Sequence, residues 1–250
     1  MTSYRMEKIY LLLLNRKKIA VTELAEIFQV TPTTIRRDLL SMEEKGVARR
    51  TRGYALACDD TERSMELDIF VDEKMRIAEA AKTFVKNRMS LALDAGRTVQ
   101  TIAEALIETS NITGLDIVTN SLPIALKLSN HFSVSMPGGT VLPQSAVLLG
   151  VDTESFFSSV NVDIAFLGTT GIDGCNGLTV SYPLHLSIKR HIVASASKTI
   201  AVLDSSKFFG RGIFTFCEFA KLDMMITVKT SENEHKLREI EKQGVELILV

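Results

Sequence analysis

Apolar residues near the amino end of the chain recur with the spacing of short amphipathic helices. A first helix is predicted over 3–15, where four apolar side chains share one face: Met6, Ile9, Tyr10 and Leu13. A second, short helix is predicted after Thr22, whose hydroxyl group is a suitable N-cap. The pattern then breaks at Gln29 and Val30, which predicts a tight turn.

A third helix is predicted over 32–45. Thr31 is a suitable N-cap, the proline after it is favoured at the first helical position, and Gly46 is a typical stop signal. The apolar stripe of this helix consists of Ile35, Leu39 and Met42. Residues 47–56 alternate around Gly53, which predicts a two-stranded hairpin.

From residue 72 onward, short apolar strands alternate with helices. Strands are predicted over 90–93, 116–118, 133–136, 164–167, 199–203, 224–227 and 245–250, and helices over 73–85, 98–109, 122–128, 184–195 and 232–243. This alternation is typical of an α/β fold with a mostly parallel sheet. The charged segment 58–71 is predicted to be a linker between two domains, 1–57 and 72–250.

Charge is divided unevenly between these two parts. The chain of 250 residues has a net charge of −1, but residues 1–57 carry 11 basic and 6 acidic side chains, a net of +5, and the remainder carries −6. A basic domain joined to an acidic one indicates that an anionic partner binds only the basic domain. With 46% hydrophobic residues the chain can bury a core, so a disordered polymer is excluded.

Membrane and disulfide-rich classes are also disfavoured. The apolar run 9–14 is far shorter than the ~20 residues of a membrane span and lacks the features of a secretory signal. The cysteines, Cys58, Cys175 and Cys217, are odd in number and widely spaced, which argues against a disulfide framework and a cysteine-bound metal. We therefore expect a cytoplasmic protein without a membrane partner, a metal or a cofactor.

The predicted order of helices, tight turn and basic hairpin is that of a winged helix-turn-helix. We expect DNA contacts from the start of the third helix and from the hairpin, through Thr31, Thr33, Thr34, Arg36, Arg37, Arg50 and Arg52. Threonine and arginine donate hydrogen bonds to phosphates, and arginine can read guanine. The alternative is an ordinary solvated basic helix, but the capped turn before the Arg36–Arg37 pair and the basic hairpin after it favour DNA.

The same residues resemble the winged helix of the DeoR family of transcription regulators. The resemblance rests on 21–25, 30–39 and 43–46, and its most specific element is Thr34-Ile35-Arg36-Arg37-Asp38-Leu39. The family usually ends its wing in His-Gly-Gly-Ala, whereas this chain has Arg52-Gly53-Tyr54-Ala55. Tyr54 therefore bears on the conformation of the wing and not on the third helix.

In the larger domain, polar segments rich in Gly, Ser and Thr follow five of the predicted strands. Because the carboxyl ends of parallel strands meet at one edge of a sheet, we expect one small-molecule site there. The candidate residues are Asp94, Gly96, Arg97, Thr98, Asn120, Ser121, Gly138, Gly139, Gly168, Gly171, Asp204 and Lys207, with Lys189 from an intervening helix. Hydrogen-bond donors among these residues can bind a phosphate group, and the carboxylates and amides can bind hydroxyl groups. This combination suits a phosphorylated sugar or polyol.

Each of these pieces also has a plainer interpretation. Gly138 and Gly139 can form an ordinary turn, Asp94 can cap a helix, and Lys189 with Arg190 can belong to a solvated helix face. The repetition of polar residues after five strands favours a shared site.

This half of the chain resembles the DeoR effector domain, whose fold is similar to ribose-phosphate isomerases and coenzyme A transferases. The matching stretches are 93–98, 117–121, 138–140, 163–173, 177–179, 189–190 and 204–208. The resemblance implies a repressor of a sugar or polyol operon that responds to a phosphorylated effector. We also expect a homo-oligomer, a dimer or tetramer, because one winged helix makes too few base contacts for a long site and paired heads read repeated half-sites. Arg97, His185 and Val228 depart from the family pattern, and the first two bear on which ligand is recognised.

The rival hypothesis is a sugar-phosphate isomerase with an accessory DNA-binding domain. That chemistry needs a positioned carboxylate base. The related isomerases carry an acidic cluster where this chain has Gly168-Thr169-Thr170-Gly171, and Asp173 is the only acid near that segment of the sequence. The sequence also contains no P-loop, nucleophile elbow or His-Glu-x-x-His motif. We therefore expect a sensor and not an enzyme.

Overall fold

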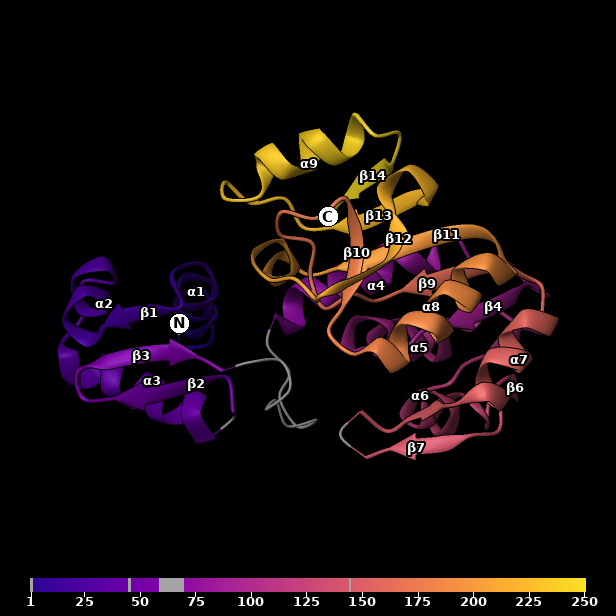
Figure 1. Ribbon diagram of the computed structural model, residues 1–250, viewed down its shortest axis with the longest axis horizontal. Helices are drawn as coiled ribbons and strands as arrows, with labels where there is room; N and C mark the ends of the chain where they lie inside the picture. Colours follow the sequence, from indigo (N-terminus) through magenta and orange to yellow (C-terminus); the bar gives the residue numbers. More distant parts are fainter. Residues whose placement is uncertain (1, 45, 59–69, 144) are drawn as a thin grey trace. The chain divides into compact units, whose positions relative to one another are not determined.

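The computed structural model describes residues 2–44, 46–58, 70–143 and 145–250 and divides the chain into two compact units, Met1–Ile69 and Phe70–Val250 (Figure 1). We call these units the head and the body. The predicted linker, 58–71, falls mostly on residues outside this description, so its bounds remain a prediction.

The head contains three helices and a small antiparallel sheet. Its elements are α1 (Thr2–Arg16), β1 (Lys18–Ala20), α2 (Val21–Ile27), α3 (Pro32–Glu44), β2 (Ala48–Thr51) and β3 (Tyr54–Ala57), with strand order β1-β3-β2. The predicted helices and the hairpin around Gly53 are confirmed, and the short strand β1 adds a third strand to the predicted two.

The structure supports one predicted helix cap and corrects another. Thr31 Oγ1 accepts a hydrogen bond from the backbone N–H of Thr34 at 3.2 Å, which caps α3 as predicted. The predicted cap at Thr22 is wrong, because α2 already begins at Val21 and its N-cap residue is Ala20. A short helix that follows directly on β1 has no separate capping segment.

A partly buried ion pair connects α1 with α3. Arg5 Nε and Nη2 donate to the two carboxylate oxygens of Asp38 at 2.5 and 3.1 Å, and Asp38 is 3% exposed. This paired geometry is the strong form of an arginine–carboxylate contact. It lies beside the apolar core residues of α1 and α3, among them Ile9, Leu13 and Leu39. Asp38 therefore fixes how α3 is held in the head.

The body is built on a seven-stranded sheet in which every pair of neighbouring strands is parallel. Its strands are β4 (Ser90–Leu93), β5 (Asp116–Val118), β6 (Ser133–Ser135), β9 (Val162–Leu167), β11 (Ala196–Leu203), β13 (Met224–Thr227) and β14 (Glu246–Leu249). The order is β14-β13-β11-β9-β4-β5-β6. The direction of strand addition reverses between β4 and β9, which makes this the topological switch point of the sheet. The predicted α/β fold is confirmed.

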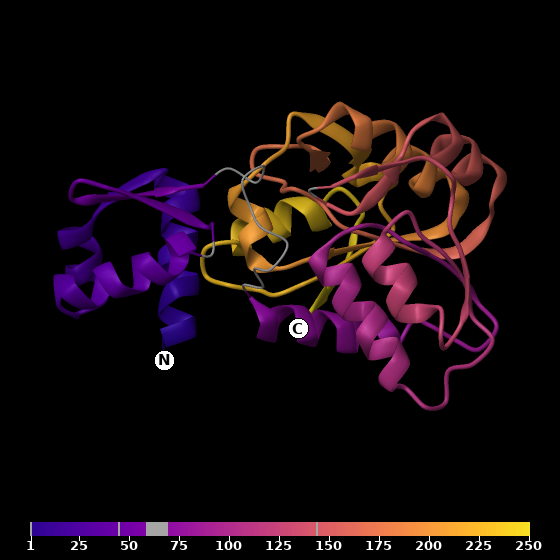
Figure 2. The same ribbon diagram turned by 90° about the horizontal axis from the view of Figure 1, so that it is seen from below.

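Helices cover both faces of this sheet (Figures 1 and 2). One layer consists of α4 (Val71–Lys82), α5 (Arg97–Glu108) and α6 (Leu122–Leu128), and the other of α7 (Val151–Ser159), α8 (Pro183–Ser195) and α9 (Glu234–Glu241). Strand residues alternate between the two cores: Leu91 and Leu93 face the first layer and Ala92 the second. None of the helices in the described residues is long and apolar enough to span a membrane.

Several short elements were not predicted from the sequence. They are the hairpin of β7 (Thr140–Leu142) and β8 (Val147–Leu149), the antiparallel pair β10 (Gly177–Val180) and β12 (Phe214–Glu218), helix α7, and the 3₁₀ helices η2 (Ser205–Phe209) and η3 (Phe219–Lys221). Helix α7 is rich in serine and buries only Thr153 and Phe157 fully, so it lacks a clear apolar stripe.

We predict that Asp38→Ala lowers the free energy of unfolding of the head by about 2 kcal/mol, because the partly exposed Arg5 loses both charge-assisted hydrogen bonds to its partner. The exposed Arg16–Glu23 pair provides the control, and Glu23→Ala should cost less than ~1 kcal/mol. Hydrogen exchange of the α3 amides in the full chain measures both. Equal protection of α3 in the two variants would contradict the assigned role of Asp38.

Candidate nucleic-acid interface and ligand site

The start of α3 presents a polar face to solvent. Thr33, Arg36 and Arg37 are exposed, whereas Ile35, Asp38, Leu39 and Met42 on the other face are buried. Within the described residues, the guanidinium groups of Arg36 and Arg37 make no hydrogen bond or ion pair. Both groups are therefore available to a partner.

The other predicted DNA contacts are partly engaged within the head. The hydroxyl groups of Thr31 and Thr34 lie 3.0 Å apart, so Thr31 acts in the cap of α3. The Glu43 carboxylate accepts hydrogen bonds from Arg50 Nε at 2.6 Å and from the Arg50 backbone N–H at 3.0 Å, and these bonds lower the pKa of Glu43. Arg50 thus ties the wing to α3, and exposed Arg52 lies in the turn beyond it.

Tyr54 contributes to the wing from the opposite strand. It is exposed, and the ammonium of Lys18 on β1 lies 4.1 Å from the centre of its ring. This cation–π contact lies within the small sheet formed by β1 and β3. The departure from the family pattern at position 54 therefore lies in the wing, where Tyr54 contacts β1.

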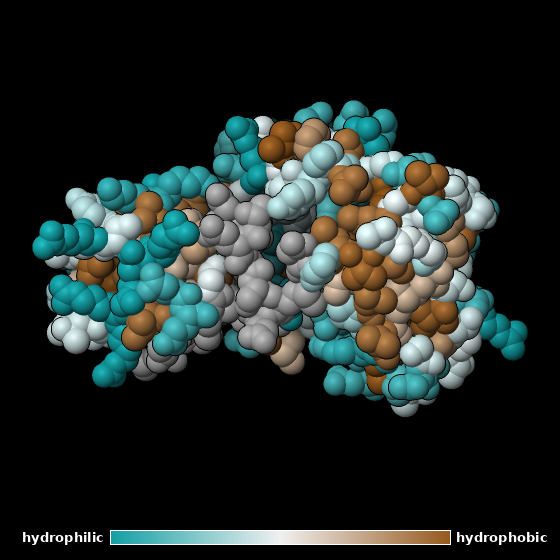
Figure 3. Space-filling view, turned by 60° about the horizontal axis from the view of Figure 1, so that its bottom comes forward, coloured by the Kyte–Doolittle hydropathy of each residue, from teal (hydrophilic) through white to brown (hydrophobic). Residues whose placement is uncertain are grey.

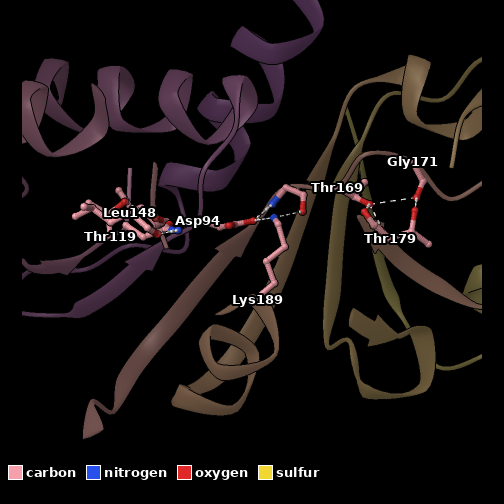
Figure 4. Close-up of polar contacts among 10 residues, drawn as sticks. Asp94, Thr119, Leu148, Thr169, Gly171, Thr179 and Lys189 are labelled. Carbon is pink, nitrogen blue, oxygen red and sulfur yellow. Dashed lines mark hydrogen bonds and ion pairs between the residues drawn. The ribbon is translucent and has the colours of Figure 1, made fainter. Parts of the chain in front are cut away.

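In the body, the ends of β4 and β9 meet at the switch point through three polar groups. Asp94 follows β4 and Gly168 follows β9. Asp94 Oδ2 accepts hydrogen bonds from the Gly168 backbone N–H at 3.0 Å and from Lys189 Nζ, which also donates to Gly168 O at 3.0 Å (Figure 4). Asp94 is 1% and Lys189 7% exposed. The plainer interpretations of these two residues are therefore wrong, because Lys189 is not solvated and the N-cap of α5, Gly96, has no side-chain cap.

The environment of this ion pair includes an imidazole and an aromatic ring. Lys189 Nζ lies 4.9 Å from the centre of the Phe216 ring. His185 precedes Lys189 by one turn of α8, and burial together with the Lys189 charge lowers the pKa of the imidazole. His185 is therefore neutral near pH 7 and adds no charge to this part of the site.

Residues after β5 adjoin the same edge. Thr119 Oγ1 donates to Leu93 O at 2.6 Å and accepts from the Ser121 backbone N–H at 3.1 Å, while Asn120 Nδ2 donates to Leu148 O at 3.2 Å. Thr119, Leu148 and Asp94 are seen close together in Figure 4. The three residues 119–121 are all buried, which separates them from ordinary loop residues.

A second polar network lies beyond Gly168. Thr169 Oγ1 donates to Thr179 O at 2.9 Å, and Thr179 Oγ1 donates to Gly171 O (Figure 4). Gly171 itself is required by packing, because a Cβ atom there would lie 1.9 Å from Gly210 O. The predicted contribution of Gly171 to ligand binding remains a prediction.

The segment after β11 is held by two carboxylates. Asp204 Oδ1 accepts from the Ser206 backbone N–H at 3.0 Å and caps η2. Glu73, on the first turn of α4, accepts from the Ser205 backbone N–H at 2.7 Å and from Ser205 Oγ at 2.9 Å, and its burial raises the pKa of the Glu73 carboxyl group. Within the described residues, the ammonium of half-buried Lys207 has no such partner.

The structure thus brings some predicted site residues into direct contact and leaves others apart. Asp94, Gly168 and Lys189 form one cluster, and Gly96, Arg97 and Thr98 follow Asp94 at the start of α5. Gly138 and Gly139 follow β6 but contact α7 and β8: Thr153 Oγ1 of α7 donates to Gly138 O at 2.8 Å, and a Cβ atom at Gly139 would lie 2.6 Å from Leu149 O of β8. Sequence analysis missed Glu73, since nothing in its local pattern points to Ser205.

No group of three or more side chains suited to a metal ion occurs among the described residues.

A double-mutant cycle tests the Asp94–Lys189 pair. We predict that Asp94→Asn and Lys189→Met each lower the free energy of unfolding by about 3–5 kcal/mol, because each leaves a buried charge unpaired, and that the double variant loses far less than the sum. Urea denaturation followed by circular dichroism measures these losses. The exposed Lys229–Glu234 pair is the control, with a coupling below ~1 kcal/mol. Additive losses at positions 94 and 189 would contradict the assignment.

Comparison with known proteins assigns both units. Residues 5–61 match the DeoR-like helix-turn-helix domain, and residues 69–229 match the DeoR C terminal sensor domain. The chain is 31% identical to the glycerol-3-phosphate regulon repressor of Haemophilus influenzae, over 99% of this chain and 96% of that protein. It is 30% identical to the putative aga operon transcriptional repressor of Escherichia coli O157:H7, over 100% of this chain and 94% of that protein.

Among solved structures, the chain is similar to a D-ribose-5-phosphate isomerase in complex with phospho-erythronic acid, with 22% identity and a TM-score of 0.40 over 54% of this chain and 52% of that one. A likeness this low carries no argument about activity. The two domain matches together span almost the whole chain in the order of head and body, and the chain belongs to the DeoR family of transcription regulators.

Proposed function

We propose that this protein is a DNA-binding transcription repressor whose body binds a phosphorylated sugar or polyol. The observation that carries the DNA-binding part is the exposed face of α3, where Arg36 and Arg37 project from a winged helix-turn-helix without partners among the described residues. The amino-terminal part of such a helix enters the major groove. The net charge of +5 over residues 1–57 supports attraction to the phosphate backbone.

The effector part of the proposal rests on the chemistry at the switch point. The amino end of α5 presents backbone N–H groups that favour an anion, and Lys207 adds an ammonium group near the end of β11. Buried polar residues after β4 and β5 supply partners for hydroxyl groups. The name of the Haemophilus influenzae relative, a glycerol-3-phosphate regulon repressor, supports a ligand of the same chemical class.

Coupling between ligand and DNA needs a ligand-dependent preference for one arrangement of the protein. The Glu73–Ser205 contact supports one route. It ties the loop that contains Lys207 to the first turn of α4, which directly follows the segment joining head and body. A ligand held by Lys207 therefore acts on the same loop that positions the start of the body.

We expect the protein to act as a homo-oligomer, because paired heads read paired half-sites. Large apolar side chains exposed on the body support this expectation: Leu126, Val151, Leu184 and Ile213 are 74%, 76%, 63% and 82% exposed. Figure 3 shows apolar residues gathered on one face of the body.

As a regulator of operator DNA, the protein is expected in the cytoplasm.

A sensor is favoured over an isomerase by the state of the carboxylates. A general base must be placed to take a proton from the substrate, and a carboxylate whose oxygens already accept from other donors is less well placed to do so. Asp94 is bound by Lys189 and Gly168, Asp204 by Ser206, and Asp173 by Lys236 at 2.6 Å. These engaged carboxylates support ligand binding without turnover.

We predict that Arg37→Ala lowers operator affinity about 10- to 100-fold, because the helix loses a guanidinium contact to a base edge or phosphate. Fluorescence anisotropy with an operator duplex selected by the wild-type protein measures the change. Arg238→Ala, an exposed arginine on α9, is the matched control and should leave affinity unchanged. If Arg37→Ala and Arg36→Ala both bind as the wild type does, α3 is not the reading helix.

For the effector part, the informative variant is Lys207→Ala. We expect it to bind operator normally but to need at least about 10-fold more sugar phosphate for release, because a charge-assisted hydrogen bond to the ligand is lost. Release from the operator duplex is titrated with a panel of sugar and polyol phosphates. Lys221→Ala, an exposed lysine on η3, is the control. An unchanged response of Lys207→Ala would exclude this loop from the site.

A further inference from the structure

Besides the exposed face of α3, the head has a second positively charged surface, on the outer face of its three-stranded sheet. In this sheet β3 lies between β1 and β2 (Figure 1). Side chains along a strand alternate between two faces. Ile19 and Ala55 are buried on the inner face, and their neighbours Lys18 and Tyr54 are exposed on the outer face.

This outer face carries positive and no negative side chains. Lys18 of β1 and Arg49 of β2 both pair with Leu56 of the central strand, so the two cations lie on either side of it. Both are exposed. The three strands, all within the described residues, contain no acidic side chain. The face therefore favours an anionic partner.

An aromatic ring fixes the position of Lys18. Lys18 pairs with Leu56 and is thus diagonal to Tyr54, a spacing that long side chains can bridge. Its ammonium lies 4.1 Å from the centre of the Tyr54 ring, and no carboxylate among the described residues pairs with it. The contact orients the ammonium and leaves N–H donors for an acceptor. The DeoR family usually has glycine in place of Tyr54, so this arrangement is a feature of this chain.

Two contacts hold the sheet against the helix-turn-helix. The backbone N–H of Val21, at the start of α2, donates to Gly53 O in the wing turn at 2.9 Å. Arg50 of β2 donates to Glu43 of α3. In a helix-turn-helix the first helix crosses the DNA backbone and the second enters the major groove. Tyr54 directly follows Gly53, so its ring lies beside the start of the helix that crosses the backbone.

We propose that Lys18, positioned by the ring of Tyr54, binds a phosphate of the operator backbone beside the groove that α3 enters. This inference rests on the DNA-binding part of the proposed function and is independent of the effector. A lysine ammonium is a point charge with three donors, which suits a phosphate oxygen. Because phosphate contacts carry no sequence information, this one adds affinity for any duplex and leaves discrimination to α3.

Fluorescence anisotropy of the full-length protein tests Lys18 with two duplexes, the operator selected by the wild type and a scrambled sequence, over a series of salt concentrations. Lys18→Met should weaken binding of both duplexes by the same factor, about 3- to 10-fold, and should make the dependence of log affinity on log salt less steep by about 0.9. Lys242→Met, an exposed lysine on the body, is the matched control and should change neither quantity.

The role of Tyr54 is tested by a double-mutant cycle. Tyr54→Leu should weaken binding about 2- to 5-fold, and Tyr54→Phe should bind as the wild type does because it keeps the ring. In the Lys18→Met background, Tyr54→Leu should cost nothing further, since the ring acts through the lysine. A loss that persists in that background overturns the positioning role.

Thermal melting verifies that each variant is folded; if Tyr54→Leu is not, the affinity and salt dependence of Lys18→Met decide the outcome. Unchanged affinity and salt dependence in Lys18→Met, with Arg37→Ala still impaired, overturn this inference while the proposed function stands. If the wild type selects no operator duplex, the proposed DNA-binding function fails and the inference fails with it.

Discussion

The ion pair between Asp94 and Lys189 joins the two halves of the parallel sheet where the strand order reverses. Asp94 belongs to the end of β4, Gly168 to the end of β9 and Lys189 to α8, so three elements converge on a few polar atoms. A buried charge pair is stable only when both partners and their remaining hydrogen bonds are in place. The path of the chain from β4 into α5 therefore depends on this contact.

The charges of Asp94 and Lys189 neutralise each other, so other groups determine the net charge at the carboxyl edge of the sheet and the kind of ligand it attracts. Lys189 is compensated by Asp94, and His185 is neutral because burial and the Lys189 charge lower its pKa. Positive charge at this edge comes, among the described residues, from Arg97, Lys207 and the amino end of α5. An anion with hydroxyl groups suits these partners.

The elements of the body were predictable because parallel strands buried on both faces give continuous apolar segments, and each is followed by a polar turn. β4, β5, α6 and β13 have the predicted bounds. The antiparallel strands, of three to five residues, and α7 were missed, since they lie outside the alternation of parallel strands and helices from which the body was predicted. Asp94 and Lys189 were candidates from the sequence, but their contact spans 95 positions. The contacts Glu73–Ser205 and Arg5–Asp38 likewise arise only from the fold.

The claim that the body binds its ligand at the switch point is tested most directly by nuclear magnetic resonance of the ¹⁵N-labelled full-length protein during titration with a sugar phosphate. Glycine amides resonate in a distinct region; the Gly168 amide donates to the Asp94 carboxylate, and Gly96 is the N-cap residue of α5, two positions after Asp94. The account predicts the largest shift changes at these two amides and at the Asn120 side chain. Saturating changes confined to the opposite edge of the sheet, with Gly96 and Gly168 unmoved, would contradict it.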